Sequence, residues 1–148
     1  MANVTEKNGW LRINDLKFFG RYNKSSENDF KVAFSDGHFT KNPTGMEWTD
    51  GRVILMQGDI IVWAKTTPRP LNASVASNGN VVLADLSFKP SDHRVGSSLT
   101  VFDSKGDTLL RHQFEFNVND CVIMNDGKTC LVNTLYPDNT LYAIDVSS

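Results

Sequence analysis

The chain has 148 residues, a formal net charge of -2 and 40% hydrophobic residues, values that suit one globular domain and exclude a disordered chain. Lys and Arg are scattered among acidic residues, so we expect no nucleic-acid partner. The apolar stretches are too short for a membrane-spanning helix and no apolar leader opens the chain, so we expect no membrane contact and, by default, a cytoplasmic protein without cofactors.

Residues 1–28 show no convincing helical periodicity. Residues 9–19 are the best candidate for a helix, but this stretch is short and rich in aromatic and β-branched side chains. We therefore predict a strand at residues 16–22 within an N-terminal extension, and this strand is a candidate to close the fold.

Five short turns then share one form: a small or polar residue, a turn-favouring residue and Gly. Gly accepts a positive φ angle without a Cβ clash, and Asp or Asn before it hydrogen-bonds its own backbone. The pattern predicts hairpins at residues 35–37, 49–51, 77–79, 104–106 and 125–127.

Aligned on Gly37, Gly79 and Gly127, the chain divides into repeats at residues 29–70, 71–118 and 119–148. The first repeat predicts strands at residues 29–34, 38–48, 52–57 and 60–66. The second predicts strands at residues 72–76, 81–86, 98–102 and 108–114. The third predicts strands at residues 120–124, 129–135 and 140–146, and it lacks a fourth.

Cys121 and Cys130 flank the last predicted turn. In the register that we expect, Cys121 lies opposite Leu131 and Cys130 opposite Val122, which points the two side chains to opposite faces of the sheet. We therefore predict two free, mostly buried thiols rather than a disulfide.

Three segments resemble blades of the WD40-like and YVTN-like β-propeller superfamily, within a resemblance that covers about residues 29–146. They are Ala-Ser-Val-Ala-Ser-Asn-Gly-Asn-Val-Val-Leu at 73–83, Leu-Thr-Val-Phe-Asp-Ser-Lys-Gly-Asp-Thr-Leu-Leu at 99–110 and Leu-Tyr-Ala-Ile-Asp at 141–145. The Gly-His and Trp-Asp marks of true WD40 repeats are absent. The resemblance implies an all-β fold, a partial or degenerate β-propeller of about three antiparallel four-stranded blades, and a scaffold for binding.

Closed propellers have about 4 to 8 blades, so about three blades leave open strand edges. Three alternatives would satisfy these edges: assembly of several chains into a ring, pairing of the strand at residues 16–22 with the third repeat, or a longer parent protein. We therefore expect a protein partner or self-association through open blade edges.

The connection at residues 88–97 gathers the candidate ligand-binding residues Lys89, Asp92, His93 and Arg94, although a polar surface loop explains the same composition. His38 and His112 are isolated, and the sequence predicts no catalytic, cofactor-binding or metal site.

Two further groups of residues have structural explanations. Asp36, Asp50 and Asp126 occupy equivalent positions before a turn glycine, where local turn chemistry favours them. Most of the aromatic residues that could line a groove are expected instead to fill the gaps between blades. These aromatic residues are Trp10, Trp48, Trp63, Phe18, Phe19, Phe114 and Phe116.

The leading functional hypothesis is a non-catalytic binding or protein-interaction module, because repeated strands occur without convergent catalytic groups. One alternative is a hydrolase or lyase with Asp92 and His93 as acid and base. The other is a structural fragment that completes a larger propeller.

Overall fold

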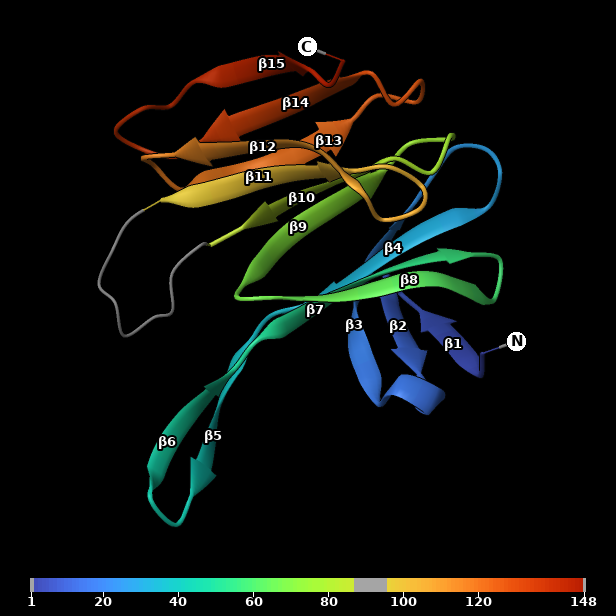
Figure 1. Ribbon diagram of the computed structural model, residues 1–148, viewed down its shortest axis with the longest axis vertical. Coiled ribbons are helices and arrows are strands. Elements are labelled where there is room, and N and C mark those ends of the chain that lie inside the picture. The colour runs from blue at the N-terminus through green and yellow to red at the C-terminus, as the bar shows by residue number, and fades with distance from the viewer. Residues whose placement is uncertain (1, 87–95, 148) are drawn as a thin grey trace.

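The computed structural model describes residues 2–86 and 96–147, and nearly all of its regular structure is β-strand, which confirms the all-β prediction (Figure 1). No helix within these ranges is long and apolar enough to span a membrane. The one helix described is a single 3-10 turn, η1, at Asn14–Leu16. The strands are β1 Val4–Lys7, β2 Trp10–Ile13, β3 Phe18–Lys24, β4 Phe30–Ser35, β5 His38–Asn42, β6 Gly45–Thr49, β7 Gly51–Gln57, β8 Ile60–Thr67, β9 Pro70–Val75, β10 Val81–Asp85, β11 Ser97–Phe102, β12 Thr108–Phe114, β13 Val118–Ile123, β14 Thr129–Thr134 and β15 Leu141–Asp145.

These strands form three antiparallel sheets and a separate hairpin. The first sheet has the order β1-β2-β3-β4-β7-β8, the second β12-β11-β10-β9 and the third β13-β14-β15, while β5 and β6 form the hairpin. The second sheet lies between the other two (Figure 1). Its four strands, and the three of the third sheet, match the predicted strands within a few residues.

The first sheet differs from the prediction, because residues 38–48 form two strands rather than one. β5 and β6 continue β4 and β7, so the four strands make one long hairpin, and its outer half, β5 and β6, projects from the sheet (Figure 1). Residues 35–37 and 49–51 therefore face each other partway along it and form no turns. Gly37 and Gly51 lack the positive φ angle found at Gly79 and Gly127, so the same tripeptide pattern serves close backbone approach at the first two glycines and turn geometry at the others.

The N-terminal residues also differ from the prediction. The strand expected at residues 16–22 is β3, and it pairs with β2 and β4 within the first sheet. Pairing with the third repeat, one of the three alternatives for the open edges, is therefore wrong. The first three strands belong to the sheet and are no extension, and Leu11, Ile13 and Phe18 are fully buried against Ala33 and Ile54.

Two apolar interfaces hold the three sheets together. Val32, Leu55 and Val81 belong to the core between the first and second sheets, and Val101 and Val132 to the core between the second and third. Across these cores β9 lies against β3 and β4, and β13 lies against β9 and β10. The first sheet thus packs on the second with the same arrangement of strands as the second packs on the third.

Side-chain amides repeat this relation along β3, β9 and β13. Asn23 on β3 donates a hydrogen bond to the Ala73 carbonyl on β9 (2.7 Å), and Asn72 on β9 donates to the Cys121 carbonyl on β13 (3.4 Å). The strands β3, β9 and β13 are therefore equivalent. The predicted alignment took β4 as the first equivalent strand, because Gly37 resembled the turn glycines.

The two cysteines are free and buried, as predicted. The expected register is wrong by one residue, since Cys121 lies opposite Val132 and Cys130 opposite Ile123. Both thiols consequently point to the same face, into the core between the second and third sheets. Burial raises the pKa of both thiols, that of Cys130 to about 12.

We expect both thiols to resist an aromatic disulfide reagent in the folded protein and to react only as the chain unfolds, since the thiolate is the reactive form and burial disfavours it. The rate at which the coloured aromatic thiolate is released, with and without denaturant, measures the reactivity of the two thiols. Rapid release of one or two equivalents from the native protein would contradict the buried position.

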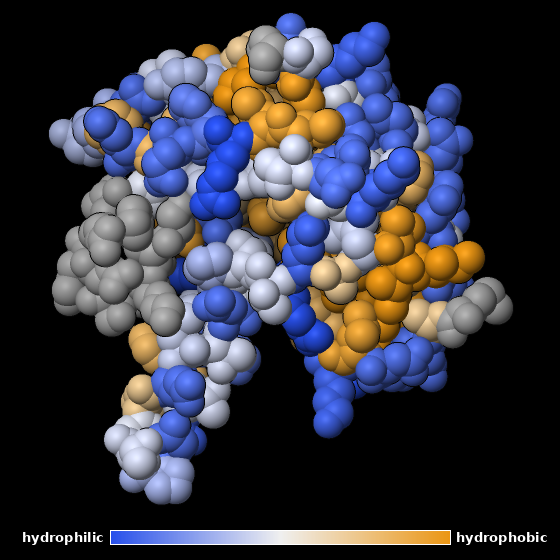
Figure 2. Space-filling model, in the orientation of Figure 1, coloured by the Kyte–Doolittle hydropathy of each residue, from blue (hydrophilic) through white to orange (hydrophobic). Residues whose placement is uncertain are grey.

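No described residue covers the outer face of the third sheet. Val122, Leu131 and Ala143 lie opposite one another across its three strands, and Leu141 is 68% exposed beside them. Hydrophobic surface gathers in this region, at the top of the molecule (Figure 2).

Candidate functional site

The predicted ligand-binding residues Lys89, Asp92, His93 and Arg94 lie outside the described residues. The described neighbours of that segment are anchored at connections between sheets. The Leu86 N–H donates to the Arg69 carbonyl (3.0 Å), and the Gly96 N–H donates to the Asn117 side chain (3.2 Å).

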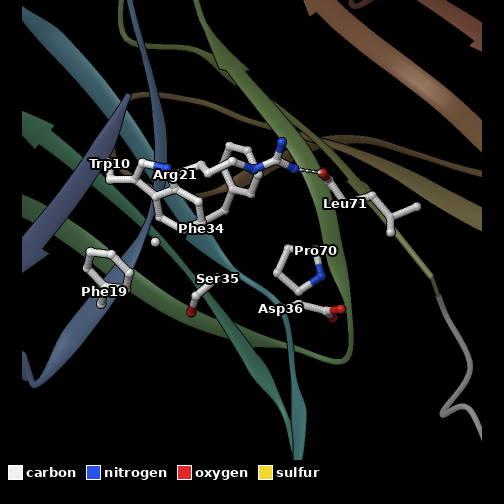
Figure 3. A pocket seen from close by; sticks show the side chains of 9 residues that line it. Trp10, Phe19, Arg21, Phe34, Ser35, Asp36, Pro70 and Leu71 are labelled. Carbon is white, nitrogen blue, oxygen red and sulfur yellow. Dashed lines mark hydrogen bonds between the residues drawn. The ribbon is translucent and has the colours of Figure 1, made fainter. Parts of the chain in front are cut away.

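A hollow of about 340 Å³, which we call the aromatic hollow, lies where β3 and β9 begin and β4 ends (Figure 3). Trp10 and Phe19 form one wall as a stacked pair, with ring centroids 5.0 Å apart and planes at 11°. Both are about half exposed, whereas Phe18, the neighbour of Phe19, is buried because successive strand residues point to opposite faces. The prediction that most of the aromatic residues fill gaps between blades is right for Phe114, which is buried between the second and third sheets, and wrong for the stacked pair. Phe18 is buried within the first sheet and not between sheets.

The opposite wall of the aromatic hollow carries polar groups (Figure 3). The Arg21 guanidinium lies over the Phe34 ring and donates to the Leu71 carbonyl (3.3 Å). The Asp36 carboxylate accepts from the Gly37 N–H and pairs with Arg69. A stacking surface beside fixed polar groups can bind a ligand, but the residues that line the hollow include no His to activate the Ser35 hydroxyl.

A second hollow of about 270 Å³, the inter-sheet hollow, lies between β8 of the first sheet and β10 to β12 of the second. Lys65 and Arg111 line it together with Asp85, Ser98 and Thr100. Burial raises the pKa of the Asp85 carboxyl, while hydrogen bonds from Thr67 and Arg69 and the charge of Arg111 oppose the rise. Sequence reasoning missed these residues, because they come from four strands and share no spacing.

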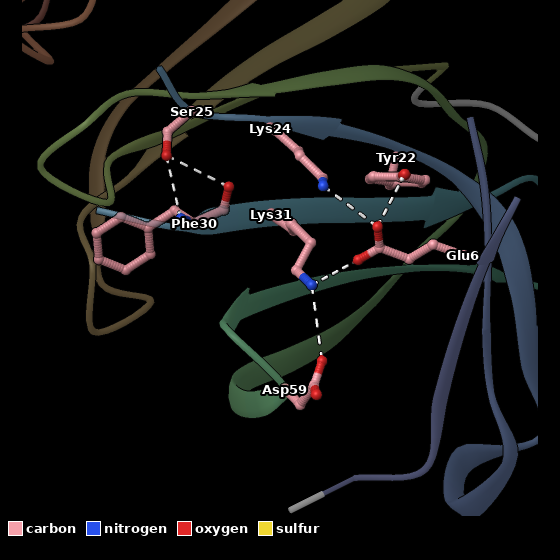
Figure 4. A network of polar contacts seen from close by, with 7 residues as sticks. All are labelled: Glu6, Tyr22, Lys24, Ser25, Phe30, Lys31 and Asp59. Atoms are coloured by element: carbon pink, nitrogen blue, oxygen red, sulfur yellow. Dashed lines mark hydrogen bonds and ion pairs between the residues drawn. The ribbon is translucent and has the colours of Figure 1, made fainter. Parts of the chain in front are cut away.

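The densest group of charges ties β1 to β4 (Figure 4). The Lys31 ammonium, with a side chain only 6% exposed, lies 2.5 Å from Glu6 and 3.7 Å from Asp59. Tyr22 donates to the Glu6 carboxylate and Lys24 pairs with it. The hydrogen bond from Lys31, more than those from Lys24 and Tyr22, holds the pKa of Glu6 below its ordinary value. This cluster is a structural clasp, because its groups satisfy one another.

The two histidines and the turn aspartate that the sequence singled out lie apart from both hollows and from the clasp. His38 is exposed on the projecting hairpin, and His112 is exposed beside the Phe114 ring. Asp126 accepts from the Lys128 N–H within its turn (2.9 Å), as turn chemistry predicts. Within residues 2–86 and 96–147 no three His, Cys, Asp or Glu side chains gather as a metal site would require.

Comparison with protein-family models and with curated proteins found no match to this sequence.

Proposed function

We propose that this chain is a non-catalytic interaction module built from propeller-like blades, and that it binds a second copy of itself through the outer face of its third sheet. The observation that carries the proposal is the exposed apolar row of that face, with Val122 46% and Leu141 68% exposed. Apolar surface gathered on one sheet face is typical of a protein interface.

The repeated contact between sheets supports the blade-like description. Asn23 and Asn72 connect β3 to β9 and β9 to β13 in the same way, and a repeated packing arrangement between neighbouring sheets is characteristic of propeller blades. The aromatic hollow, which combines a stacking wall with an Arg and an Asp, supports binding rather than catalysis.

The two ends of the stack favour a pair of chains over a ring. β1 and β2 cover the outer face of the first sheet, and the third sheet has no such cover in the described residues. A head-to-tail ring needs both outer faces, whereas a two-fold pair needs only one. Third sheet against third sheet therefore fits this asymmetry.

The residue on β13 that corresponds to Asn23 on β3 and Asn72 on β9 also favours a two-fold pair. Asp120 occupies the position of Asn72, because each side chain accepts a hydrogen bond from the next backbone N–H. A carboxylate only accepts, so Asp120 cannot donate to the carbonyl of a following strand as Asn23 and Asn72 do. A further sheet of the same kind would lack this contact.

Size-exclusion chromatography with light scattering tests the proposal. At about 100 µM chain, above the micromolar dissociation constants of modest interfaces, we expect twice the mass of one chain. Val122→Lys should return the mass to that of one chain, because it places a charge in the apolar contact.

Ile60→Lys is the matched control, because Ile60 is 60% exposed on β8 of the first sheet. This variant should keep the two-chain mass. A wild-type protein with the mass of one chain at this concentration would overturn the proposal, and so would dissociation by Ile60→Lys to the same extent as by Val122→Lys.

A further inference from the structure

The inter-sheet hollow lies at a polar end of an otherwise apolar interface between two sheets. Sheets packed face to face normally meet through apolar side chains, and the interface between the first and second sheets does so around Leu83 and Phe102. At one end of this interface the side chains become polar. In the second sheet Asp85 lies opposite Ser98, and Thr100 lies opposite Arg111.

The polar residues at this end are deeply buried. Asp85 is 4% exposed, Ser98 1% and Thr100 6%. The Ser98 hydroxyl has no hydrogen-bond partner among the described residues, and Ser98 is one of the residues that line the hollow. Buried hydroxyl groups are nearly always satisfied, so a buried one without a partner beside a cavity points to a ligand that supplies the missing hydrogen bond.

The charges around the hollow are mainly positive. Lys65 comes from β8 and Arg111 from β12, so a cation stands on each of the two sheets. The Lys65 ammonium lies over the rings of Trp63 and Phe102, 5.7 and 5.2 Å from their centroids. Neither cation forms a salt bridge within 4.0 Å among the described residues.

Asp85 offsets part of this positive charge but does not cancel it, because one carboxylate stands against two cations. Its carboxylate accepts the Arg69 N–H (2.7 Å) and is hydrogen-bonded by the Thr67 side chain, so protein groups already hold it. The cations and the Ser98 hydroxyl are therefore the groups left to meet a ligand.

We propose that the inter-sheet hollow binds a small anion, a carboxylate or a phosphate, which lies between Lys65 and Arg111 and accepts a hydrogen bond from Ser98. Guanidinium and ammonium groups recognise both anions through charge-assisted hydrogen bonds, and Arg does so in a bidentate fashion. The hollow of about 270 Å³ accommodates a ligand of a few heavy atoms.

The test is an NMR titration of the labelled chain with sodium phosphate and, separately, with sodium acetate, at matched ionic strength set by chloride. We expect saturable shifts of the Ser98 and Thr100 amide signals with at least one anion. Saturation with only one of them identifies the phosphate or carboxylate class. Absence of saturable shifts with both would overturn the proposal.

Variants separate this site from general attraction of anions. Arg111→Met and Lys65→Met should each weaken binding about tenfold or more, because each loses a charge-assisted contact. Lys128→Met is the matched control, since Lys128 is an exposed cation on a turn of the third sheet. Equal weakening by Lys128→Met and Arg111→Met would contradict a defined site.

Ser98→Ala provides a readout that a purely structural residue would not give. It should weaken anion binding about threefold or more while raising the melting temperature of the ligand-free chain, because it removes a buried hydroxyl without a partner. Unchanged affinity in Ser98→Ala would contradict the role of its hydroxyl in the site. Circular dichroism of each variant confirms that the sheets are formed.

Discussion

Replacing Glu6 by Gln should lower the free energy of unfolding by about 2 to 3 kcal/mol, because it leaves the buried Lys31 ammonium without its nearest counter-charge. Removal of one partner from a fully buried pair costs about 3 to 5 kcal/mol. The expected loss is smaller here, since Asp59 remains 3.7 Å from Lys31 and the Glu6 side chain is 27% exposed. Urea unfolding followed by circular dichroism measures the change.

A double-mutant cycle isolates the cause. Lys31→Met removes the buried charge, so Glu6→Gln combined with Lys31→Met should recover most of the stability lost in Glu6→Gln alone. Lys24→Met is the matched control, because Lys24 pairs with the same carboxylate from a side chain that is 53% exposed. It should change stability by about 0.5 kcal/mol or less. An equal loss in Lys24→Met and Glu6→Gln would contradict the importance of burial.

The same clasp makes stability depend on pH in a defined direction. The pKa of Glu6 is lower in the folded protein than its ordinary value, so the unfolded chain takes up the proton first on acidification. The contribution of Glu6 is thus complete above the ordinary carboxyl pKa of about 4.3 and is lost as pH falls through the folded value. The stability difference between wild type and Glu6→Gln should shrink over that range.

Gly51→Ala should lower the free energy of unfolding by about 3 kcal/mol, at the upper end of the usual cost of overpacking. A Cβ atom on Gly51 would lie 2.3 Å from the Ser35 carbonyl oxygen, 2.5 Å from Cδ of Pro70 and 2.9 Å from the Gly37 nitrogen. These atoms belong to backbone or to a proline ring, so no side-chain rotation relieves the contact. The sheet itself must shift.

Thermal unfolding of Gly51→Ala beside Asp50→Ala checks this expectation. Asp50 is the exposed neighbour of Gly51, and its replacement should stay within about 0.5 kcal/mol of wild type. Because Ser35 and Pro70 also line the aromatic hollow, near-ultraviolet circular dichroism should report a disturbed aromatic environment in Gly51→Ala alone. A melting temperature for Gly51→Ala equal to that of Asp50→Ala would refute the close approach.

The second and third sheets were predictable because their hairpins depend on local chemistry. Gly79, Gly106 and Gly127 have φ angles of 87°, 93° and 74°, conformations that Gly adopts without strain. The first sheet was not predictable in the same way. Gly37 and Gly51 carry the same tripeptide signature, but their role comes from strands and rings that approach from elsewhere in the chain.

The two hollows were also not predictable from local sequence. In the sequence, nothing distinguishes the residues of the inter-sheet hollow from ordinary strand residues, and no spacing relates them. These residues are Lys65, Asp85, Ser98 and Arg111. They meet because β8 of one sheet lies against β10 to β12 of another. The sequence-based site at residues 88–97 depended instead on a local cluster of polar residues, which a surface loop also provides.

Local patterns in the sequence were sufficient to predict the all-β class and the turn-glycine hairpins of the second and third sheets, because alternation and glycine conformation act within a few residues. The packing of the sheets is what places β1 and β2 over the first sheet, turns both cysteines to one face and forms the two hollows between sheets. Each of these depends on which faces meet and in which register, and a one-residue shift in register reverses the face that every side chain occupies.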